Sequence, residues 1–251
     1  MEINKELYGL LGCNIGYSQS PQIFQKLWAD DPTPREYRLI DTEKPEDFLA
    51  EVRDSEEWIG FSVTIPYKEW IIPHLDSLTA IAQQIGAVNA VRVTPQGLIG
   101  HNTDVSGFLS AFEEYLLTDF ISPDKKALVL GTGGASKAVV AGLRSKGMEV
   151  LRVSRSRERG EITYEEITPQ IISEVSLIVN ATPLGSKQYP EQAPDIPYHL
   201  LTAQHLLYDL SYTPDTGFLA HGSEEVMRIN GLPMLQAQAE VAFKFFKYGI
   251  Y

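Results

Sequence analysis

Cysteine, positive charge and long apolar runs are all scarce in this chain, and each shortage removes a class of protein. The single cysteine, Cys13, excludes an internal disulfide and a cysteine-based metal cluster, and it fits a reducing cytosol. A formal net charge of −12 argues against a general nucleic-acid or anionic-membrane binder, because either needs a basic surface. No apolar run approaches the roughly 20 residues of a membrane span, and charged residues interrupt the start, so no signal peptide is visible.

These shortages favour a cytoplasmic protein that acts on small molecules and has no metal, nucleic-acid or membrane partner. With 251 residues the chain can form one large domain or two modest ones, each with its own core. We expect a monomer or a homodimer, and the composition does not decide between them.

A glycine-rich turn is the first feature that indicates a ligand. An apolar run at 127–130, typical of a buried strand, leads into Gly131 and Gly133, and small helix-forming residues follow. Gly131 permits a tight turn, while Gly133 has no side chain to keep a pyrophosphate from the backbone. The helix N-terminus that follows offers free N–H groups to negative charge. Turns after buried strands also carry glycine without binding anything, so that alternative stays open.

The end of the next predicted strand, 149–153, indicates which nucleotide would bind. NAD-binding domains place an acidic residue there for the ribose 2′-hydroxyl, whereas NADP-binding domains tend to place an arginine near the 2′-phosphate. Here Ser154 is followed by three arginines, Arg155, Arg157 and Arg159, with only one acidic residue among them. The pattern favours NADP, and an exposed basic loop is the alternative.

Two serines stand at the first predicted strand-to-helix turn. Ser20 precedes Pro21 and is typical of a helix N-cap followed by proline at the first helical position. Ser18 has no such structural explanation. Two hydroxyls two residues apart can converge on a small polar ligand.

Lys68 and Asp104 are charged residues at element boundaries. The pattern predicts a strand to Ile65 and a helix from Pro66, which places Lys68 in the first helical turn, where the helix dipole disfavours a cation. Lys68 could simply face solvent, or it could be a lysine that acts as a base. Asp104 precedes an amphipathic helix and could be only its N-cap.

Two amides lie where apolar residues are expected. Asn89 stands early in an otherwise apolar strand of a predicted hairpin. Gln238 falls on or beside the apolar stripe of the last predicted helix, 235–248. A buried amide needs a hydrogen-bond partner, which another protein group or a substrate hydroxyl could supply.

Seven motifs occur in one order along nearly the whole chain, and together they resemble the shikimate 5-dehydrogenase family. The resemblance runs from about residue 7 to the final helix and depends on the conjunction of the motifs rather than on any one of them. The motifs are SQSP (18–21), VTIPYK (63–68), GAVN (86–89), NTD (102–104), GTGGAS (131–136), NAT (180–182) and QAQ (236–238).

The resemblance implies an α/β fold of two domains. An N-terminal α/β substrate domain with a mostly parallel sheet would comprise residues 1–104 and 232–251, because the C-terminal helix returns to it. A Rossmann-type NADP-binding domain would comprise residues 105–231. The implied reaction is the reversible reduction of 3-dehydroshikimate to shikimate by NADPH, in aromatic amino-acid (chorismate) biosynthesis.

The motifs also assign roles to residues of this chain. Lys68 and Asp104 match the catalytic pair, with Lys68 accepting the hydroxyl proton in the oxidation direction and Asp104 orienting it. The residues that would bind shikimate are Ser18, Ser20, Thr64, Asn89, Tyr212 and Gln238. The residues that would bind NADP are Gly131, Gly133, Gly134, Ala135, Ser136, Ser154, Arg155, Arg159, Asn180 and Thr182.

Three departures from the family pattern stand out. Ser62 replaces a usual asparagine, and Pro233 lies at the approach to the last helix. The segment between Arg155 and Leu177 is short for a helical crossover between parallel strands, so we expect a trimmed sheet edge there.

Three alternatives remain. A relative could oxidise quinate or prefer NAD. A methylene-tetrahydrofolate dehydrogenase pairs a similar cofactor domain with a catalytic lysine, although Ser18, Ser20 and Gln238 argue against it. A small-molecule-binding module that has lost turnover is the third, although the presence of both Lys68 and Asp104 weighs against it.

Overall fold

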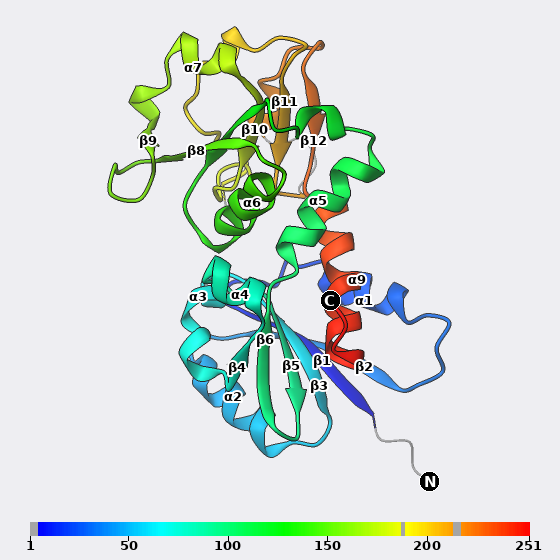
Figure 1. The fold of residues 1–251 in the computed structure, drawn as a ribbon. Helices are drawn as coiled ribbons and strands as arrows, with labels where there is room; N and C mark the ends of the chain where they lie inside the picture. Colours follow the sequence, from blue (N-terminus) through cyan, green and yellow to red (C-terminus); the bar gives the residue numbers. More distant parts are fainter. Residues whose placement is uncertain (1–4, 187–188, 213–216) are drawn as a thin grey trace. The chain divides into compact units, whose positions relative to one another are not determined.

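The computed structural model describes residues 5–186, 189–212 and 217–251. The chain divides into two compact units, which we call unit 1 (residues 1–104 and 238–251) and unit 2 (residues 105–237). Figure 1 shows the elements of both units. The chain returns from unit 2 to unit 1 at residue 238, inside helix α9 (Leu232–Tyr248). The predicted boundary was at residue 231.

Unit 1 is built on a six-stranded sheet with the order β2-β1-β3-β5-β6-β4. β1 pairs in parallel with β2 and β3, β4 pairs in parallel with β6, and the hairpin strand β5 runs antiparallel to β3 and β6. The strands are β1 (Glu6–Gly12), β2 (Arg35–Asp41), β3 (Trp58–Val63), β4 (Ser77–Leu78), β5 (Ala90–Thr94) and β6 (Gly97–His101). The sheet is therefore mostly parallel, as predicted.

Helices cover both faces of this sheet (Figure 1). One buried cluster joins it to α2 (Pro45–Asp54), α3 (Tyr67–Trp70) and α4 (Ala80–Ile85). A second, aromatic cluster on the other face joins it to α1 (Ser20–Leu27) and α9. Phe246 of α9 packs so closely over Gly60 that a Cβ atom on that glycine would lie 2.5 Å from the ring. A side chain at residue 60 would therefore push α9 off the sheet.

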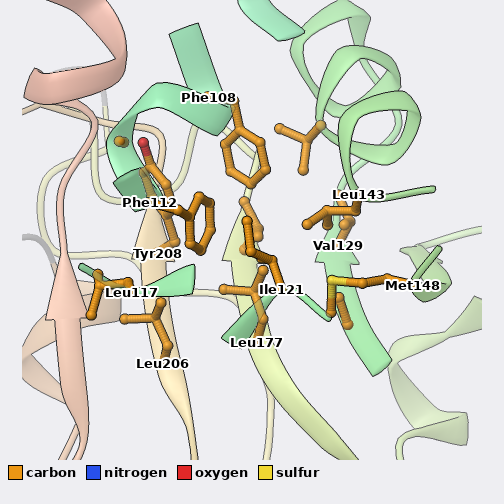
Figure 2. Close-up of a cluster of buried hydrophobic side chains, with 14 of the residues drawn as sticks. Phe108, Phe112, Leu117, Ile121, Val129, Leu143, Met148, Leu177, Leu206 and Tyr208 are labelled. Carbon is orange, nitrogen blue, oxygen red and sulfur yellow. The ribbon is translucent and has the colours of Figure 1, made fainter. Parts of the chain in front are cut away.

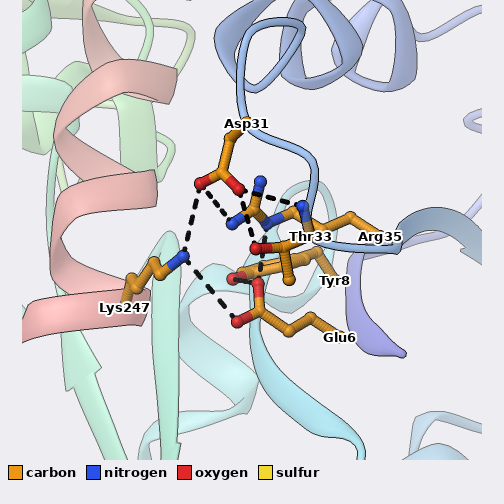
Figure 3. Close-up of polar contacts among 6 residues, drawn as sticks. All are labelled: Glu6, Tyr8, Asp31, Thr33, Arg35 and Lys247. Atoms are coloured by element: carbon orange, nitrogen blue, oxygen red, sulfur yellow. Dashed lines mark hydrogen bonds and ion pairs between the residues drawn. The ribbon is translucent and has the colours of Figure 1, made fainter. Parts of the chain in front are cut away.

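A buried arginine also connects the elements around α9 (Figure 3). The Arg35 side chain is 1% exposed, and its guanidinium donates to Glu6 (Nε to Oε2, 2.7 Å) and to Asp31 (Nη2 to Oδ2, 2.7 Å). Lys247 of α9 lies within 3.8 Å of the Glu6 carboxylate and 3.7 Å of the Asp31 carboxylate. Two carboxylates shared by two cations balance the buried charge of Arg35, although its Nη1 atom has no hydrogen-bond partner in the described parts of the chain, and they link the end of α9 to β1 and to the segment before β2.

Unit 2 contains a fully parallel six-stranded sheet with the order β12-β11-β10-β7-β8-β9. Its strands are β7 (Lys126–Leu130), β8 (Glu149–Ser154), β9 (Ile162–Thr163), β10 (Val175–Asn180), β11 (Leu206–Asp209) and β12 (Met227–Ile229). The central strands read as continuous apolar runs because both faces are covered. Together with the sheet of unit 1, this arrangement is the predicted two-sheet α/β fold.

The two faces of the unit 2 sheet have separate cores. One face packs against α5 (Asp104–Glu114) and α6 (Gly134–Ser145), with Phe108 and Phe112 of α5 on the ring of Tyr208 (Figure 2). The other face packs against α7 (Pro169–Glu174) and α8 (Gly217–Ala220). The described 3-10 helices are η1 (Ile72–His74), η2 (Thr118–Phe120), η3 (Tyr164–Glu166) and η4 (Tyr198–Leu200).

The edge of this sheet beyond β8 is trimmed, as the short segment after Arg155 predicted. Residues 155–161 lead from β8 to β9 without a helix, and β9 contributes only two paired residues. Parallel strands are usually joined by a crossover of about a dozen residues or more, and the shorter connection here leads to a strand of only two residues. The chain then returns through η3 and the six-residue α7 to β10.

Candidate active site

The catalytic candidates lie at one end of the unit 1 sheet for a topological reason. The carboxyl ends of parallel strands meet at the same edge, so the segments after β1 and β3 are neighbours there. The N–H of Cys13, after β1, donates to the carbonyl of Ile65, after β3 (3.1 Å). Because β5 is antiparallel to both of its neighbours, its start and the end of β6 face this edge as well.

Lys68 and Asp104 form an ion pair at this edge. The Nζ atom of Lys68 lies 2.6 Å from Oδ2 of Asp104, and the side chains are only 15% and 7% exposed. The Lys68 carbonyl accepts the backbone N–H of Val88 (2.8 Å), which fixes the short helix α3 against the segment before β5. The alternative of a solvent-facing lysine is therefore wrong.

Asp104 is the first residue of α5, and its carboxylate is used in the site rather than as a cap. Oδ1 accepts a hydrogen bond from Nδ2 of Asn89 (2.8 Å), while Oδ2 faces Lys68. The backbone N–H of Asp104 donates to Oδ1 of Asn102 (3.0 Å). Nδ2 of Asn102 donates to the carbonyl of Ala87 (3.0 Å). The sequence assigned no role to Asn102, although it belongs to the NTD motif.

Asn89 is held by Thr103, another residue that the sequence left without a role. The backbone N–H of Thr103 donates to Oδ1 of Asn89 (2.7 Å), and this fixes the amide so that Nδ2 points to Asp104 and to the Thr103 hydroxyl. The Thr103 hydroxyl also donates to Oε1 of Gln238 (3.3 Å). A chain of hydrogen bonds thus runs from Lys68 to α9, and the fully buried Thr103 lies within it. The sequence signal for Thr103 was its place in the NTD motif.

The hydroxyls of the two serines bond to one another, and the helix boundary differs from the prediction. Helix α1 begins at Ser20 itself, with Gln19 in the N-cap position and no side-chain cap, so the N-cap prediction for Ser20 is wrong by one residue. Its hydroxyl instead accepts from the Ser18 hydroxyl (3.1 Å), and Ser18 Oγ accepts the Ser20 backbone N–H (3.2 Å). Both hydroxyls are thereby fixed in one small turn at the end of β1.

Two other predicted substrate residues have different locations. Thr64 directly follows β3 at the same sheet edge, and its N–H donates to the carbonyl of Leu11 (2.9 Å). Tyr212 follows β11 and belongs to unit 2. A role for Tyr212 beside the substrate stays a prediction.

The glycine-rich turn of unit 2 has the backbone that its sequence predicts. Gly131 has φ of 106°, and a Cβ atom there would lie 3.0 Å from the carbonyl oxygen of Ala181, so both conformation and space require glycine. A Cβ atom on Gly133 would meet nothing within 4 Å, so the space above this backbone is open. The backbone at Gly133 can therefore be approached without obstruction by a side chain at this position.

Helix α6 presents its N-terminus beside that open space. It begins at Gly134, so the N–H groups of Gly134, Ala135 and Ser136 have no partner in their own helix. The Ser136 hydroxyl is used in the turn, because it donates to the carbonyl of Gly131 (2.6 Å) and is fully buried. A serine in place of the third glycine thus locks the turn.

Asn180 and Thr182 organise the loop after β10 rather than exposing their side chains. Oδ1 of Asn180 accepts from the Thr182 hydroxyl (2.7 Å) and its backbone N–H (3.1 Å). The Asn180 amide donates to the carbonyl of Leu184 (2.9 Å) and to Asp209 (3.2 Å). This loop packs against Gly131, so both residues shape the turn from the neighbouring strand.

The basic segment after β8 is partly neutralised. Arg157 pairs with Glu166, and Arg152 of β8 pairs with Glu161 (Nε to Oε2, 3.1 Å). Arg155 and Arg159 are exposed, and no ion pair to either occurs among the described residues. Ser154 is buried and its hydroxyl accepts the backbone N–H of Ser156 (3.2 Å), which shapes the turn that carries these arginines.

The described parts of the chain contain no group of three or more His, Cys, Asp or Glu side chains placed to hold a metal ion. Among the described helices, none is long and apolar enough to cross a membrane.

A parallel sheet with a glycine-rich turn in one unit, and a buried lysine–aspartate pair in the other, define a class: two-unit α/β proteins of the pyridine-nucleotide dehydrogenase type. Residues 10–91 match the family model described as the shikimate dehydrogenase substrate binding domain. A shikimate dehydrogenase (NADP(+)) from Clostridium botulinum is 33% identical over 243 residues, which cover 92% of each chain. The chain belongs to the shikimate dehydrogenase family.

Solved structures agree with this assignment. Shikimate 5-dehydrogenase from Thermus thermophilus, in complex with NADP(H) and shikimate, superposes with a TM-score of 0.85 at 32% identity, covering 98% of this chain and 94% of that one. A quinate dehydrogenase from Corynebacterium glutamicum, in complex with NAD, has a TM-score of 0.82 at 27% identity, covering 98% of this chain and 95% of that one.

Proposed function

We propose that this protein is an NADP-dependent shikimate dehydrogenase that interconverts shikimate and 3-dehydroshikimate in aromatic amino-acid (chorismate) biosynthesis. The observation that carries the proposal is the buried pair of Lys68 and Asp104, with Asn89 on the second carboxylate oxygen. Family membership supports the same reaction. Unit 1 would bind shikimate and unit 2 would bind NADP.

The substrate residues suit a polyol acid. Ser18, Ser20 and Thr64 offer hydroxyls after β1 and β3, and Asn89 and Gln238 offer amides at the same edge of the sheet. Shikimate has three hydroxyls and a carboxylate, and short hydroxyl and amide groups can donate to or accept from each of them. Tyr212 is a further candidate from unit 2.

Lys68 would exchange the proton of the reaction. In the oxidation direction Lys68 would take the proton from the substrate hydroxyl as the carbon–oxygen double bond forms and the hydride leaves for the cofactor. In the reverse direction the ammonium returns a proton to the carbonyl oxygen. Asp104 holds the Lys68 Nζ atom by its Oδ2, while Asn89 keeps the carboxylate from rotating.

The turn and helix N-terminus of unit 2 fit the cofactor. The open space at Gly133 and the free N–H groups of Gly134 and Ala135 suit a pyrophosphate. Arg155 and Arg159 are the exposed cations left for a 2′-phosphate, because Arg157 is paired with Glu166. NADP, when bound, would supply or accept the hydride.

A steady-state assay of the full chain tests this proposal. Shikimate and quinate are each offered with NADP and with NAD, and reduced nicotinamide is followed by its absorbance. We expect the largest kcat/KM for shikimate with NADP. Turnover of quinate with NAD at higher kcat/KM would instead support the alternative quinate enzyme. No turnover with either acid, together with saturable binding of one of them, would support a non-catalytic module. Turnover of methylene-tetrahydrofolate would point to the other dehydrogenase.

We infer two further properties that this assay does not address. A monomer or homodimer is expected, which light scattering coupled to gel filtration measures directly. A cytoplasmic location is expected from the single Cys13 and the biosynthetic role, and cell fractionation tests it.

A further inference from the structure

The loop that carries the two serines is anchored by a side chain from a neighbouring strand. Residues 13–19 connect β1 to α1, and Asn14 in this loop has φ of 57°. A residue in this left-handed conformation can turn successive backbone N–H groups toward one point, and such a concavity favours an anion. The N–H groups of Asn14 and Ile15 both point to the carboxylate of Asp41.

The two contacts use both oxygens of Asp41. The Asn14 N–H donates to Oδ1 (N···O 2.6 Å), and the Ile15 N–H donates to Oδ2 (N···O 3.0 Å). Asp41 is the last residue of β2 and lies in register with Gly12, the last residue of β1. The next N–H, of Thr42, donates to the Gly12 carbonyl (3.1 Å). The carboxylate therefore reaches over the end of β1 from a fixed ladder position.

The anchored residues connect directly to the serines. Ile15 is 2% exposed, and its carbonyl accepts the backbone N–H of Ser18 (2.9 Å). The Ser18 hydroxyl then donates to Ser20 (3.1 Å) and accepts its backbone N–H (3.2 Å). Hydrogen bonds within residues 14–20 therefore connect the Asp41 carboxylate to the hydroxyls of both serines.

We propose that Asp41 is a positioning residue for substrate binding, acting through the backbone of residues 14–18. It touches neither the Lys68–Asp104 pair nor the turn of unit 2 in any contact of the described residues. This inference depends on the proposed function, because it assumes that Ser18 and Ser20 bind the substrate. Loss of the carboxylate frees two N–H groups to bond with water, and the loop then samples conformations in which the serines diverge.

Kinetics of Asp41→Ala, Asp41→Asn and the control Glu43→Ala test the inference. Glu43 is an exposed carboxylate two positions further along the chain. For Asp41→Ala we expect KM for shikimate to rise about tenfold, the scale of charge-assisted hydrogen bonds, with kcat and KM for NADP unchanged. Asp41→Asn keeps one acceptor oxygen and should fall between the wild type and Asp41→Ala. Glu43→Ala should match the wild type.

Amide hydrogen exchange of the ligand-free protein gives a readout that needs no activity. We expect the segment 13–20 to exchange faster in Asp41→Ala than in wild type or Glu43→Ala, with the strands of both units unchanged. Wild-type KM for shikimate in an active Asp41→Ala, or an equal loss of kcat and of affinity for NADP, would overturn the inference. Unchanged exchange in segment 13–20 would overturn it as well. If the wild type does not turn over shikimate, the proposed function fails instead, and the exchange result alone decides whether Asp41 holds the loop.

Discussion

The Nζ atom of Lys68 lies 2.6 Å from Oδ2 of Asp104, although 36 positions separate the two residues in the chain. The second oxygen of the same carboxylate accepts from Asn89, so the carboxylate cannot rotate away without losing a buried hydrogen bond. Each residue comes from a different element: Lys68 from α3, Asp104 from α5 and Asn89 from the segment before β5. The pair therefore places an amine that can carry a proton beside a carboxylate that is held in position.

Replacing Lys68 by alanine should remove the proton carrier and leave the binding groups in place. We expect Lys68→Ala to lower kcat by about 10² to 10⁴, with little change in KM for shikimate. Initial rates over a range of shikimate concentrations measure both constants. Lys44→Ala, at an exposed lysine, serves as the control. A kcat near that of the wild type would remove Lys68 from the mechanism.

Thr103→Ala should show that the link between Asn89 and Gln238 is more than packing. The Thr103 hydroxyl is fully buried and bonds to the amides of Asn89 and Gln238. Its removal therefore takes one buried hydrogen-bond partner from each amide. We expect a loss of about 1–3 kcal/mol in the free energy of unfolding in urea, and a higher KM for shikimate. Thr103→Ser retains the hydroxyl and should restore KM. If the serine variant behaves like the alanine variant, the methyl group rather than the hydroxyl matters.

Arg155 and Arg157 should differ in their effect on cofactor choice. Arg155 is exposed without an ion pair among the described residues, whereas Arg157 pairs with Glu166. We expect Arg155→Ala to raise KM for NADP about tenfold or more and to leave KM for NAD nearly unchanged, because only NADP carries the 2′-phosphate. Titration with 2′,5′-ADP measures the same contact without turnover. Equal losses in the two arginine variants would contradict this division.

His101 should make stability depend on pH on the acid side. Its ring is buried between Phe245 and Tyr251, its Nδ1 atom lies 2.8 Å from the Thr79 hydroxyl, and burial lowers its pKa from 6.5 to about 4. The unfolded chain therefore binds a proton at a higher pH than the folded chain does. The contribution of His101 to the free energy of unfolding is therefore fully present above pH 6.5 and is lost as the pH falls toward 4.

Urea unfolding between pH 4.5 and 7.5 measures this effect, and His101→Gln removes the titrating group. One proton changes the slope of the free energy of unfolding against pH by at most about 1.4 kcal/mol per pH unit. The slope for His101→Gln should therefore be smaller than that of the wild type by up to this amount. The exposed His199→Gln is the control for loss of an imidazole. Parallel profiles for His101→Gln and the wild type would argue against a buried neutral ring.

Much of the fold could be predicted from local patterns. The glycine-rich turn after the apolar run 127–130 and the hairpin of β5 and β6 appear where the sequence predicts them, because each depends on residues within a few positions. Errors are confined to boundaries. Ser20 reads as an N-cap before Pro21, yet the helix begins one residue earlier, because the serine hydroxyls bond to one another instead.

The sequence proposed the residues of the candidate site but not the hydrogen bonds that connect them. Asn102 and Thr103 belong to the NTD motif, but their roles arise only when the end of β6 meets the segment before β5. Likewise, Asp41 reads as the polar end of a strand until β2 pairs with β1 and brings it over residues 14–15. Pairing across a sheet is a long-range event that no sequence window contains.

Local sequence patterns indicated the α/β class, the glycine-rich turn and the basic segment after β8, and they singled out Lys68, Asp104 and the two serines as candidates. Periodicity, turn chemistry and motif order are properties of neighbouring residues, so they can be read without coordinates. The folded arrangement of the elements sets which arginine is already paired, which hydroxyl locks the turn and which oxygen of Asp104 faces Lys68. These contacts depend on the distances between elements that are far apart in the sequence, and those distances are set by how the elements pack.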